Sequence, residues 1–467
     1  MSAFKRLRQS WSGTDHELRV LSASGQLGFG IPQESFVRGL KRKPHVIAAD
    51  MGSVDPGPVY LGSGKIAAPE TLVRSDLRLV LRAALALDVP LLIGSAGTAG
   101  ANAHLDRVLD ILREIAREDA LSFQLGVLRS EVPKGDVGAA LTGGRLRPIG
   151  ALDLDADGLS QTGAIVGQAG MEPFRRALEG GADVIVAGRA CDTAPFAVVP
   201  AMLGYPIGPA IHMSKILECT SLCCDPGGRD AMLATLQGDG FILESMNLAR
   251  AATPVSVAAH ALYEQADPFV IHEPEGAVHL DAAQYVAVDD RRVKVTGARW
   301  QPAKQPSVKI EGSRRLGARA VLLAGVADPG FIAASADILR DVEDVVRGLL
   351  AQQDWTLHAR RYGIDGVTDW ADMPDSLPRE VFLLCECVAP DADTAKLVLA
   401  ALRQQLLHFG FEGRRATGGN LAFPITPAEL DAGDAYAFSV YHILEIDSWS
   451  ALSTLFPVSI ETIGDHT

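Results

Sequence analysis

The chain has 467 residues, which is too long for one ordinary domain and predicts two or three. Apolar residues make up 48% and charged residues 21%, so a large core can form. The formal net charge of −14 excludes nucleic acid as a main partner, because phosphate neutralisation needs a basic face.

No run of eighteen apolar residues occurs, so we expect no membrane span and no membrane partner. The first ten residues are basic and amphipathic and lack the apolar core of a secretory signal. The six cysteines are clustered in sequence, which is typical of reduced thiols. We therefore expect a cytoplasmic protein.

The first half of the chain alternates strands, glycine-rich loops and helices. Short apolar runs predict strands at residues 17–23, 45–49, 89–94, 122–128 and 183–187. Helical periodicity predicts helices at residues 32–40, 77–87 and 102–118, and from about 172 and 195. This alternation predicts an α/β domain over residues 1–250, Rossmann-like and built on a parallel sheet.

The rhythm changes after residue 250. Two alternating runs joined by Asp-Asp-Arg-Arg predict a β-hairpin at 286–297. Further strands are predicted at 307–312, 320–326, 380–388 and 435–445, and helices at 333–350 and 393–408. We expect residues 251–467 to form an α+β domain that completes the cleft.

The strand predicted at 183–187 is followed by the polar loop 189–193. Ligands bind at the carboxyl ends of parallel strands, so this loop predicts the active site. Arg189 supplies a guanidinium for carboxylate binding, Asp192 an acid/base group, and Cys191 a nucleophile beside a positive charge. Thr193 or Asp192 is expected to cap the next helix.

Two further loops are rich in glycine. In the loop 94–100, small residues and free amides before a helix favour an anion, with four candidate binding residues: Gly94, Ser95, Gly97 and Thr98. A close-packing turn is the alternative. The turn Gly25-x-x-Gly28-x-Gly30, followed by Asp50, has the layout of a dinucleotide site, but its glycine order departs from the usual one. Tight turns in the sheet are the favoured interpretation.

A possible metal or acid/base cluster lies further along. His260 and Glu264 are four residues apart and would share a helix face, with His272, Glu273 and His279 nearby. Cys219 to Cys224 lack the second Cys pair of a structural zinc site, so we expect buried inert thiols and assign no metal ligand.

The stretch 408–424 combines two arginines with Thr417-Gly-Gly-Asn420. Arg414 or Arg415 could clamp a carboxylate bidentately, with Thr417 and Asn420 as further binding residues. An exposed turn with solvated arginines is the alternative, and the sequence leaves both open.

Four stretches together resemble the acyclic terpene utilisation (AtuA-type) family of bacterial proteins. They are Val184-Ile-Val-Ala-Gly-Arg-Ala-Cys-Asp-Thr-Ala194, Ala258-Ala-His-Ala-Leu-Tyr-Glu-Gln-Ala-Asp-Pro-Phe269, Ala416-Thr-Gly-Gly-Asn-Leu-Ala-Phe-Pro424 and Phe438-Ser-Val-Tyr-His442. The similarity runs from about residue 18 to the C-terminus. It implies a soluble bacterial catabolic protein that handles branched acids or their coenzyme A thioesters. The family has no settled catalytic residues to carry over.

We expect an enzyme that acts on a small branched carboxylic acid or its acyl-CoA thioester, as a lyase, hydratase or isomerase. Asp50, Asp192 or His260 would transfer protons, and Arg189 and Arg415 would bind the carboxylate. No cofactor is assigned, and metal assistance stays open. The alternatives are a non-catalytic binding or scaffold subunit and a nucleotide-dependent enzyme. The large apolar content predicts a homo-oligomer.

Overall fold

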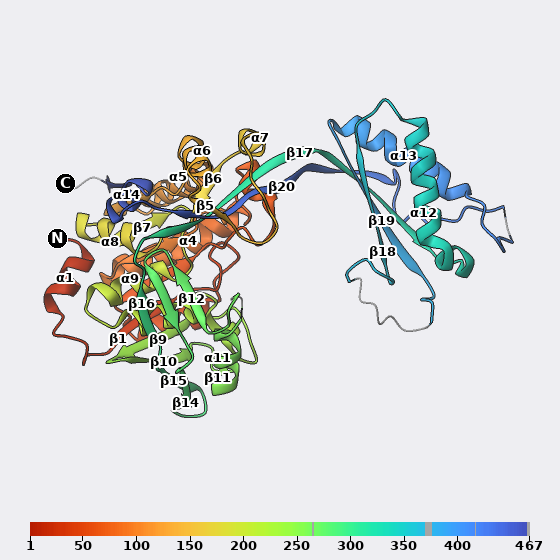
Figure 1. Ribbon diagram of the computed structural model, residues 1–467. Helices are drawn as coiled ribbons and strands as arrows, with labels where there is room; N and C mark the ends of the chain where they lie inside the picture. The colour runs from red at the N-terminus through yellow and green to blue at the C-terminus, as the bar shows by residue number, and fades with distance from the viewer. Residues whose placement is uncertain (264–265, 369–375, 416, 465–467) are drawn as a thin grey trace. The chain divides into compact units, whose positions relative to one another are not determined.

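The computed structural model describes residues 1–263, 266–368, 376–415 and 417–464. It contains two compact units, which Figure 1 shows with their element labels. The first unit comprises residues 1–313 and 438–467, and the second comprises residues 314–437. Residue 250, where the sequence rhythm changes, lies inside the first unit. Within the described residues, no helix combines the length and the apolar character needed to cross a membrane.

A ten-stranded mixed sheet is the centre of the first unit. Its strands follow the order β14 (Gln284–Ala287), β15 (Arg292–Thr296), β10 (Gly240–Ser245), β9 (Met232–Gln237), β1 (Leu18–Ser22), β2 (Val46–Asp50), β3 (Leu91–Gly94), β7 (Val184–Ala187), β4 (Phe123–Leu128) and β21 (Val458–Ile463). The five strands from β1 to β4 in this order are parallel to one another. The parallel sheet predicted for the N-terminal half is therefore present, with antiparallel strands added at both sides.

The Rossmann-like order is not confirmed. From β1 to β3 the strand order runs in one direction, and the chain then passes beyond β7 to β4 before returning. A doubly wound sheet instead reverses direction next to its first strand. The predicted hairpin at 286–297 forms as β14 and β15, but β15 pairs with β10 and so joins the first sheet.

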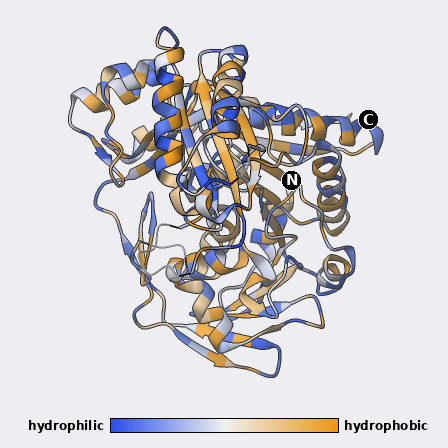
Figure 2. Ribbon diagram, turned by 90° about the vertical axis from the view of Figure 1, so that its right-hand side faces the viewer, coloured by the Kyte–Doolittle hydropathy of each residue, from blue (hydrophilic) through white to orange (hydrophobic). Residues whose placement is uncertain are grey.

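Both faces of the parallel strands are buried, as their continuous apolar runs predict. In β2, Val46 and Ala48 pack into one core while Ile47 and Ala49 pack into the other. One face is covered by α2 (Gln33–Lys41), α4 (Glu70–Leu87) and α5 (Asn102–Glu118), and the other by α8 (Met171–Gly180), α9 (Ala194–Met202) and α10 (Ile207–Leu217). In Figure 2 the strands are largely hydrophobic, whereas many helices carry both kinds of residue.

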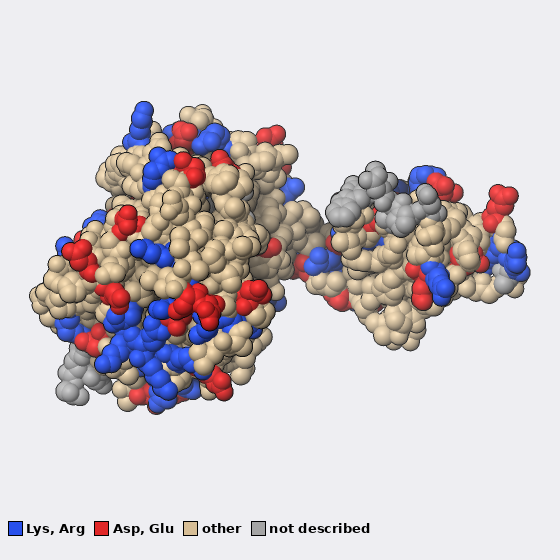
Figure 3. Space-filling view, turned by 90° about the horizontal axis from the view of Figure 1, so that it is seen from below, with Lys and Arg blue, Asp and Glu red and all other residues tan. Residues whose placement is uncertain are grey.

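Shorter elements complete the first unit. They are α1 (Ala3–Ser10), α3 (Pro58–Ser63), α6 (Lys134–Thr142), α7 (Ala156–Gln161), η1 (Thr220–Cys223), α11 (Pro254–Ala261), α14 (Trp449–Leu455), β5 (Leu146–Pro148), β6 (Ile165–Gly167), β8 (Cys224–Asp225), β11 (Ala251–Ala252), β12 (Val270–Glu273), β13 (Gly276–His279) and β16 (Arg299–Pro302). Figure 3 shows Lys and Arg side chains gathered on part of one face of this unit, with Asp and Glu beside them. The acidic net charge is therefore not spread evenly.

The second unit is an α+β structure. Its sheet contains β18 (Thr356–Tyr362), β19 (Val381–Ala389), β17 (Ser307–Val326) and β20 (Glu429–Glu445), with α12 (Pro329–Leu349) and α13 (Ala392–His408) packed on it. The unit boundaries fall within β17 and β20. The two strands predicted at 307–312 and 320–326 are parts of the single strand β17. Its pairing with β19 starts at Ala318 and continues through the second run.

Candidate functional site

Loops at the carboxyl ends of β2 and β7 contribute to the candidate site, and the loop after β3 lies beside them. These strands are neighbours and parallel, so the residues after Asp50, Gly94 and Ala187 emerge at one edge of the sheet. Two pockets that share Ser53, Asp55 and Asp192 lie there. We name them the acid pocket and the cation pocket.

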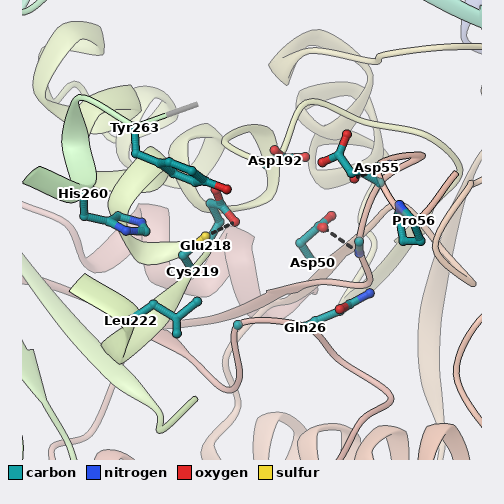
Figure 4. Close-up of a pocket in the computed structure, with 13 residues that line it drawn as sticks. Gln26, Asp50, Asp55, Pro56, Asp192, Glu218, Cys219, Leu222, His260 and Tyr263 are labelled. Carbon is teal, nitrogen blue, oxygen red and sulfur yellow. Dashed lines mark hydrogen bonds between the residues drawn. The ribbon is translucent and has the colours of Figure 1, made fainter. Parts of the chain in front are cut away.

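The acid pocket has a volume of about 460 Å³ (Figure 4). It is lined by Gly25, Gln26, Asp50, Gly52, Ser53, Asp55, Pro56, Asp192, Glu218, Cys219, Leu222, His260 and Tyr263. The cation pocket, of about 240 Å³, is lined by Ser53, Asp55, Gln168, Arg189, Cys191, Asp192, Thr193, Lys215, Ile271, His272, Glu273, Lys309 and Tyr441. Asp50, Asp192 and His260, which the sequence suggests as alternative acid/base groups, therefore line one pocket.

Asp50 is the most buried acid of the acid pocket, with only 4% of its surface exposed. Its Oδ2 accepts a hydrogen bond of 2.7 Å from the Gly52 amide, while Oδ1 has no partner among the described residues. Burial, and then the charges of Asp192 and Glu218, raise the pKa of Asp50 well above its usual value. The surroundings of Asp50 thus favour its protonated form.

Asp192 lies between two cations. Its Oδ1 is 3.4 Å from Arg189 Nη1, and its Oδ2 is 3.7 Å from Lys215 Nζ. Asp192 therefore makes two ion pairs, while Asp50 lies buried in the same pocket. Two carboxyl groups in one pocket thus have unlike environments, which is the arrangement typical of an acid and base pair.

Lys215 and Glu218 were not predicted from the sequence. Lys215 lies in the buried helix α10, and its Nζ donates to Glu218 Oε1 over 2.9 Å. Burial and the nearby Asp192 raise the pKa of Glu218 to about 7, although Lys215 opposes the shift. The available signal was a charged pair at the end of an otherwise apolar helix, because buried charges need partners.

Arg189 belongs to a buried ion-pair network. Its Nε donates to Glu311 Oε2 at 2.9 Å, and Nη1 donates to Ser95 Oγ at 3.1 Å and to the Ala190 carbonyl at 2.9 Å. Burial opposes the charge of Arg189, but Glu311 and Asp192 outweigh it and raise the pKa of Arg189. Much of this guanidinium is therefore engaged with the protein itself.

The sequence predicts a positive environment for Cys191, but the structure shows acidic side chains acting on its thiol. Burial, and then the charges of Glu273 and Glu275, raise the pKa of the Cys191 thiol well above its usual value. Thr193 occupies the N-cap position of α9 without capping it, because its hydroxyl donates to Glu273 Oε1 at 2.5 Å. Burial raises the pKa of Glu273 to about 8, and Glu275 and Asp192 add to the shift while Thr193 opposes it.

His260 lines the acid pocket from α11. Burial, and then the charge of Lys215, lower its pKa to about 4, so its imidazole is neutral at pH 7. Its predicted partner Glu264 lies outside the described residues. Within the described part of the chain, no group of three or more His, Cys, Asp or Glu side chains is arranged to hold a metal ion.

The loop 94–100 makes its hydrogen bonds within the protein. The amides of Ser95, Ala96, Thr98 and Gly100 donate to backbone carbonyls, and Ser95 and Thr98 are fully buried. A Cβ on Gly100 would lie 2.1 Å from the backbone nitrogen of Arg189, so only glycine lets the two backbone segments lie this close. Gly94, Ser95, Gly97 and Thr98 line neither pocket, and the loop supports Arg189 instead.

In the glycine turn 25–30, on which the dinucleotide alternative depends, backbone amides already have a hydrogen-bond partner within the protein. The amides of Gly28, Gly30 and Ile31 all donate to the carboxylate of Asp76, at 2.9 to 3.0 Å. Asp76 therefore occupies the place where the turn would bind an external anion. No spacing pattern in the sequence indicates this contact.

The arginine-rich loop of the second unit is described by itself. Arg414 donates to the carbonyls of His408, Phe409 and Gly418, and Asn420 Nδ2 donates to the carbonyls of Leu406 and Phe409. Arg415 and Thr417 are exposed. Arg414 and Asn420 thus satisfy the last carbonyls of α13, which need partners outside the helix.

Comparison with known proteins gives one match. The family model described as acyclic terpene utilisation family protein AtuA matches residues 234–429. No curated protein and no solved structure matches the chain. Two of the four motifs, 258–269 and 416–424, lie inside the matched segment, and so do the site residues His260, Glu273 and Glu311. Over residues 234–429 the chain is therefore similar to the acyclic terpene utilisation family, which its motifs resemble.

Proposed function

We propose that this protein is a catabolic enzyme that transfers protons on a branched carboxylic acid or its coenzyme A thioester, as a hydratase, lyase or isomerase. The family description supports a role in the breakdown of acyclic terpenes. The acid pocket supports the reaction class, because it combines a buried carboxyl group of raised pKa with an ion-paired one.

One observation carries the proposal. Asp50 is buried, its pKa is raised by burial and by Asp192, and its Oδ1 has no partner among the described residues. A buried carboxyl whose pKa is raised can donate a proton to a substrate, while an ion-paired neighbour can accept one.

A dehydration illustrates the chemistry. Asp192 would take the proton from the carbon next to the carbonyl group, and the electron pair of that C–H bond would form the double bond. The bond between the β-carbon and its hydroxyl group would break, and Asp50 would give its proton to that hydroxyl, which leaves as water. Hydration is the reverse, and isomerisation uses both proton transfers without loss of water.

The test is deuterium exchange. The purified protein is incubated in D₂O with a branched 3-hydroxyacyl-CoA and with its free acid, and mass spectrometry follows label at the α-carbon and the appearance of the unsaturated product. Loss of a general acid or base typically costs a factor of about 10² to 10⁴. Asp50→Asn and Asp192→Asn should each lose activity on this scale, whereas Asp110→Asn, at an exposed site on α5, should not.

No exchange with either substrate class in the native protein would contradict the proposal and favour a non-catalytic binding subunit. Equal exchange in Asp50→Asn and the native protein would remove Asp50 from the mechanism.

A further inference from the structure

The cation pocket contains a positive charge that the proton transfer does not use. Lys309, on β17, points its Nζ to Glu311 Oε1 at 3.1 Å, and Arg189 Nε is 2.9 Å from the other oxygen of the same carboxylate. Burial opposes the charge of Glu311, but the two cations outweigh it and lower its pKa. Lys309 therefore shares its carboxylate partner with Arg189, which also pairs with Asp192.

Lys309 has fewer ion-pair partners among the described residues than the other two cations of the pocket. Three further ion pairs join Asp192 to Arg189, Asp192 to Lys215, and Glu218 to Lys215. Glu273 retains its proton near neutral pH, because its pKa is about 8. In the described part of the chain, Glu311 is the one ion-pair partner of Lys309.

The surroundings of Lys309 suit a small anion. Its Nζ lies 4.4 Å from the centre of the Tyr441 ring, and Gln168, which lines the same pocket, donates to Glu311 at 3.1 Å. The side chain of Lys309 is 26% exposed, so the ammonium is partly accessible. A volume of about 240 Å³ accommodates a carboxylate and a few carbon atoms.

We propose that the cation pocket binds a free carboxylate of the substrate through Lys309, while the reacting part of the same molecule lies in the acid pocket. The two pockets share Ser53, Asp55 and Asp192, so one ligand can extend through both. This inference rests on the proposed function and narrows it: the substrate is a branched dicarboxylic acid or a thioester that keeps one free carboxylate.

The test is calorimetric titration of the full-length protein at pH 7 with four probes: glutarate, 3-methylglutarate, isovalerate and inorganic phosphate. The native protein should bind the two dicarboxylates more tightly than isovalerate or phosphate. Lys309→Met should weaken glutarate binding about tenfold to a hundredfold, since a charge-assisted hydrogen bond is lost. Lys309→Arg should restore most of the binding, and Lys304→Met, at an exposed position nearby, should change nothing.

Three results would overturn the inference: glutarate binding no tighter than isovalerate binding, glutarate binding unchanged in Lys309→Met, or phosphate binding as tight as glutarate binding. The two proposals fail separately. Asp50→Asn should still bind glutarate although it loses exchange, so exchange retained in Asp50→Asn refutes only the assigned acid. Exchange on a monocarboxylic thioester without glutarate binding refutes only the carboxylate pocket.

Discussion

The loop after β7 and the loop after α13 contain similar residues and use them differently. Both combine arginine and glycine with other hydrogen-bonding side chains. After α13, Arg414 and Asn420 donate to carbonyls at the helix end. After β7, Asp192 reaches two pockets whose carboxyl atoms are not all satisfied, such as Asp50 Oδ1 within the described residues. The candidate site is distinguished by polar atoms beside a cavity that have no hydrogen-bond partner among the described residues, and not by the number of polar residues in its loop.

The largest effect is expected when the buried ion pair of the first loop is broken. Arg189→Met should lower the free energy of unfolding by about 3–5 kcal/mol, because Glu311 is left buried with half of its charge compensation. Urea denaturation of the native and variant proteins measures this. The double variant Arg189→Met with Glu311→Leu should recover part of the loss, and no recovery would show that the ion pair is not the cause.

The second effect depends on pH. The folded pKa of Glu273 is about 8, against 4.5 for the free side chain, so between about pH 5 and pH 8 the folded protein holds a proton that the unfolded chain has lost. This contribution to stability is present at low pH and falls as the pH rises, by up to about 1.4 kcal/mol per pH unit.

Glu273→Gln should therefore flatten the decrease in melting temperature between pH 5 and pH 8. The exposed variant Glu179→Gln serves as the control and should keep the native slope. Parallel curves for Glu273→Gln and the native protein would show that Glu273 is ionised in the folded state.

A smaller effect is expected in the second loop. Asn420→Ala removes two hydrogen bonds to the end of α13 and should cost about 1–3 kcal/mol of stability. It should leave α-proton exchange unchanged, and the exposed Thr417→Ala should alter neither property. If Asn420→Ala abolishes exchange in a folded protein, the contrast between the two loops fails and Asn420 belongs to the site.

The smallest effect is expected at Cys191. Cys191→Ser should keep the proton exchange, because the raised pKa of the thiol disfavours a thiolate at neutral pH. Mass spectrometry after iodoacetamide treatment at pH 7 should find Cys191 unmodified in the folded protein. Rapid alkylation at this position would restore the nucleophile hypothesis.

Local patterns in the sequence were sufficient for most of the elements and for part of the site. Apolar runs with glycine ends predicted the buried parallel strands, and helical spacing predicted α5 at residues 102–118. Asp50 and Asp192 were also chosen as candidates from sequence, because each lies at the end of a predicted strand or in the loop after one, where ligands bind in parallel sheets. These features depend on neighbours in the chain or on a general rule of parallel sheets.

Only the tertiary structure decided which polar groups already have hydrogen-bond or ion-pair partners within the protein. Asp76 fills the glycine turn from a helix 45 to 48 residues away, and Glu311 reaches Arg189 across 122 residues. Lys215, Glu218 and Lys309 were likewise identified as pocket residues only from the folded structure. Hydrogen bonds and charges act through space, so a residue's partners, and with them its pKa and its availability to a ligand, are set by the folded chain and not by its local sequence.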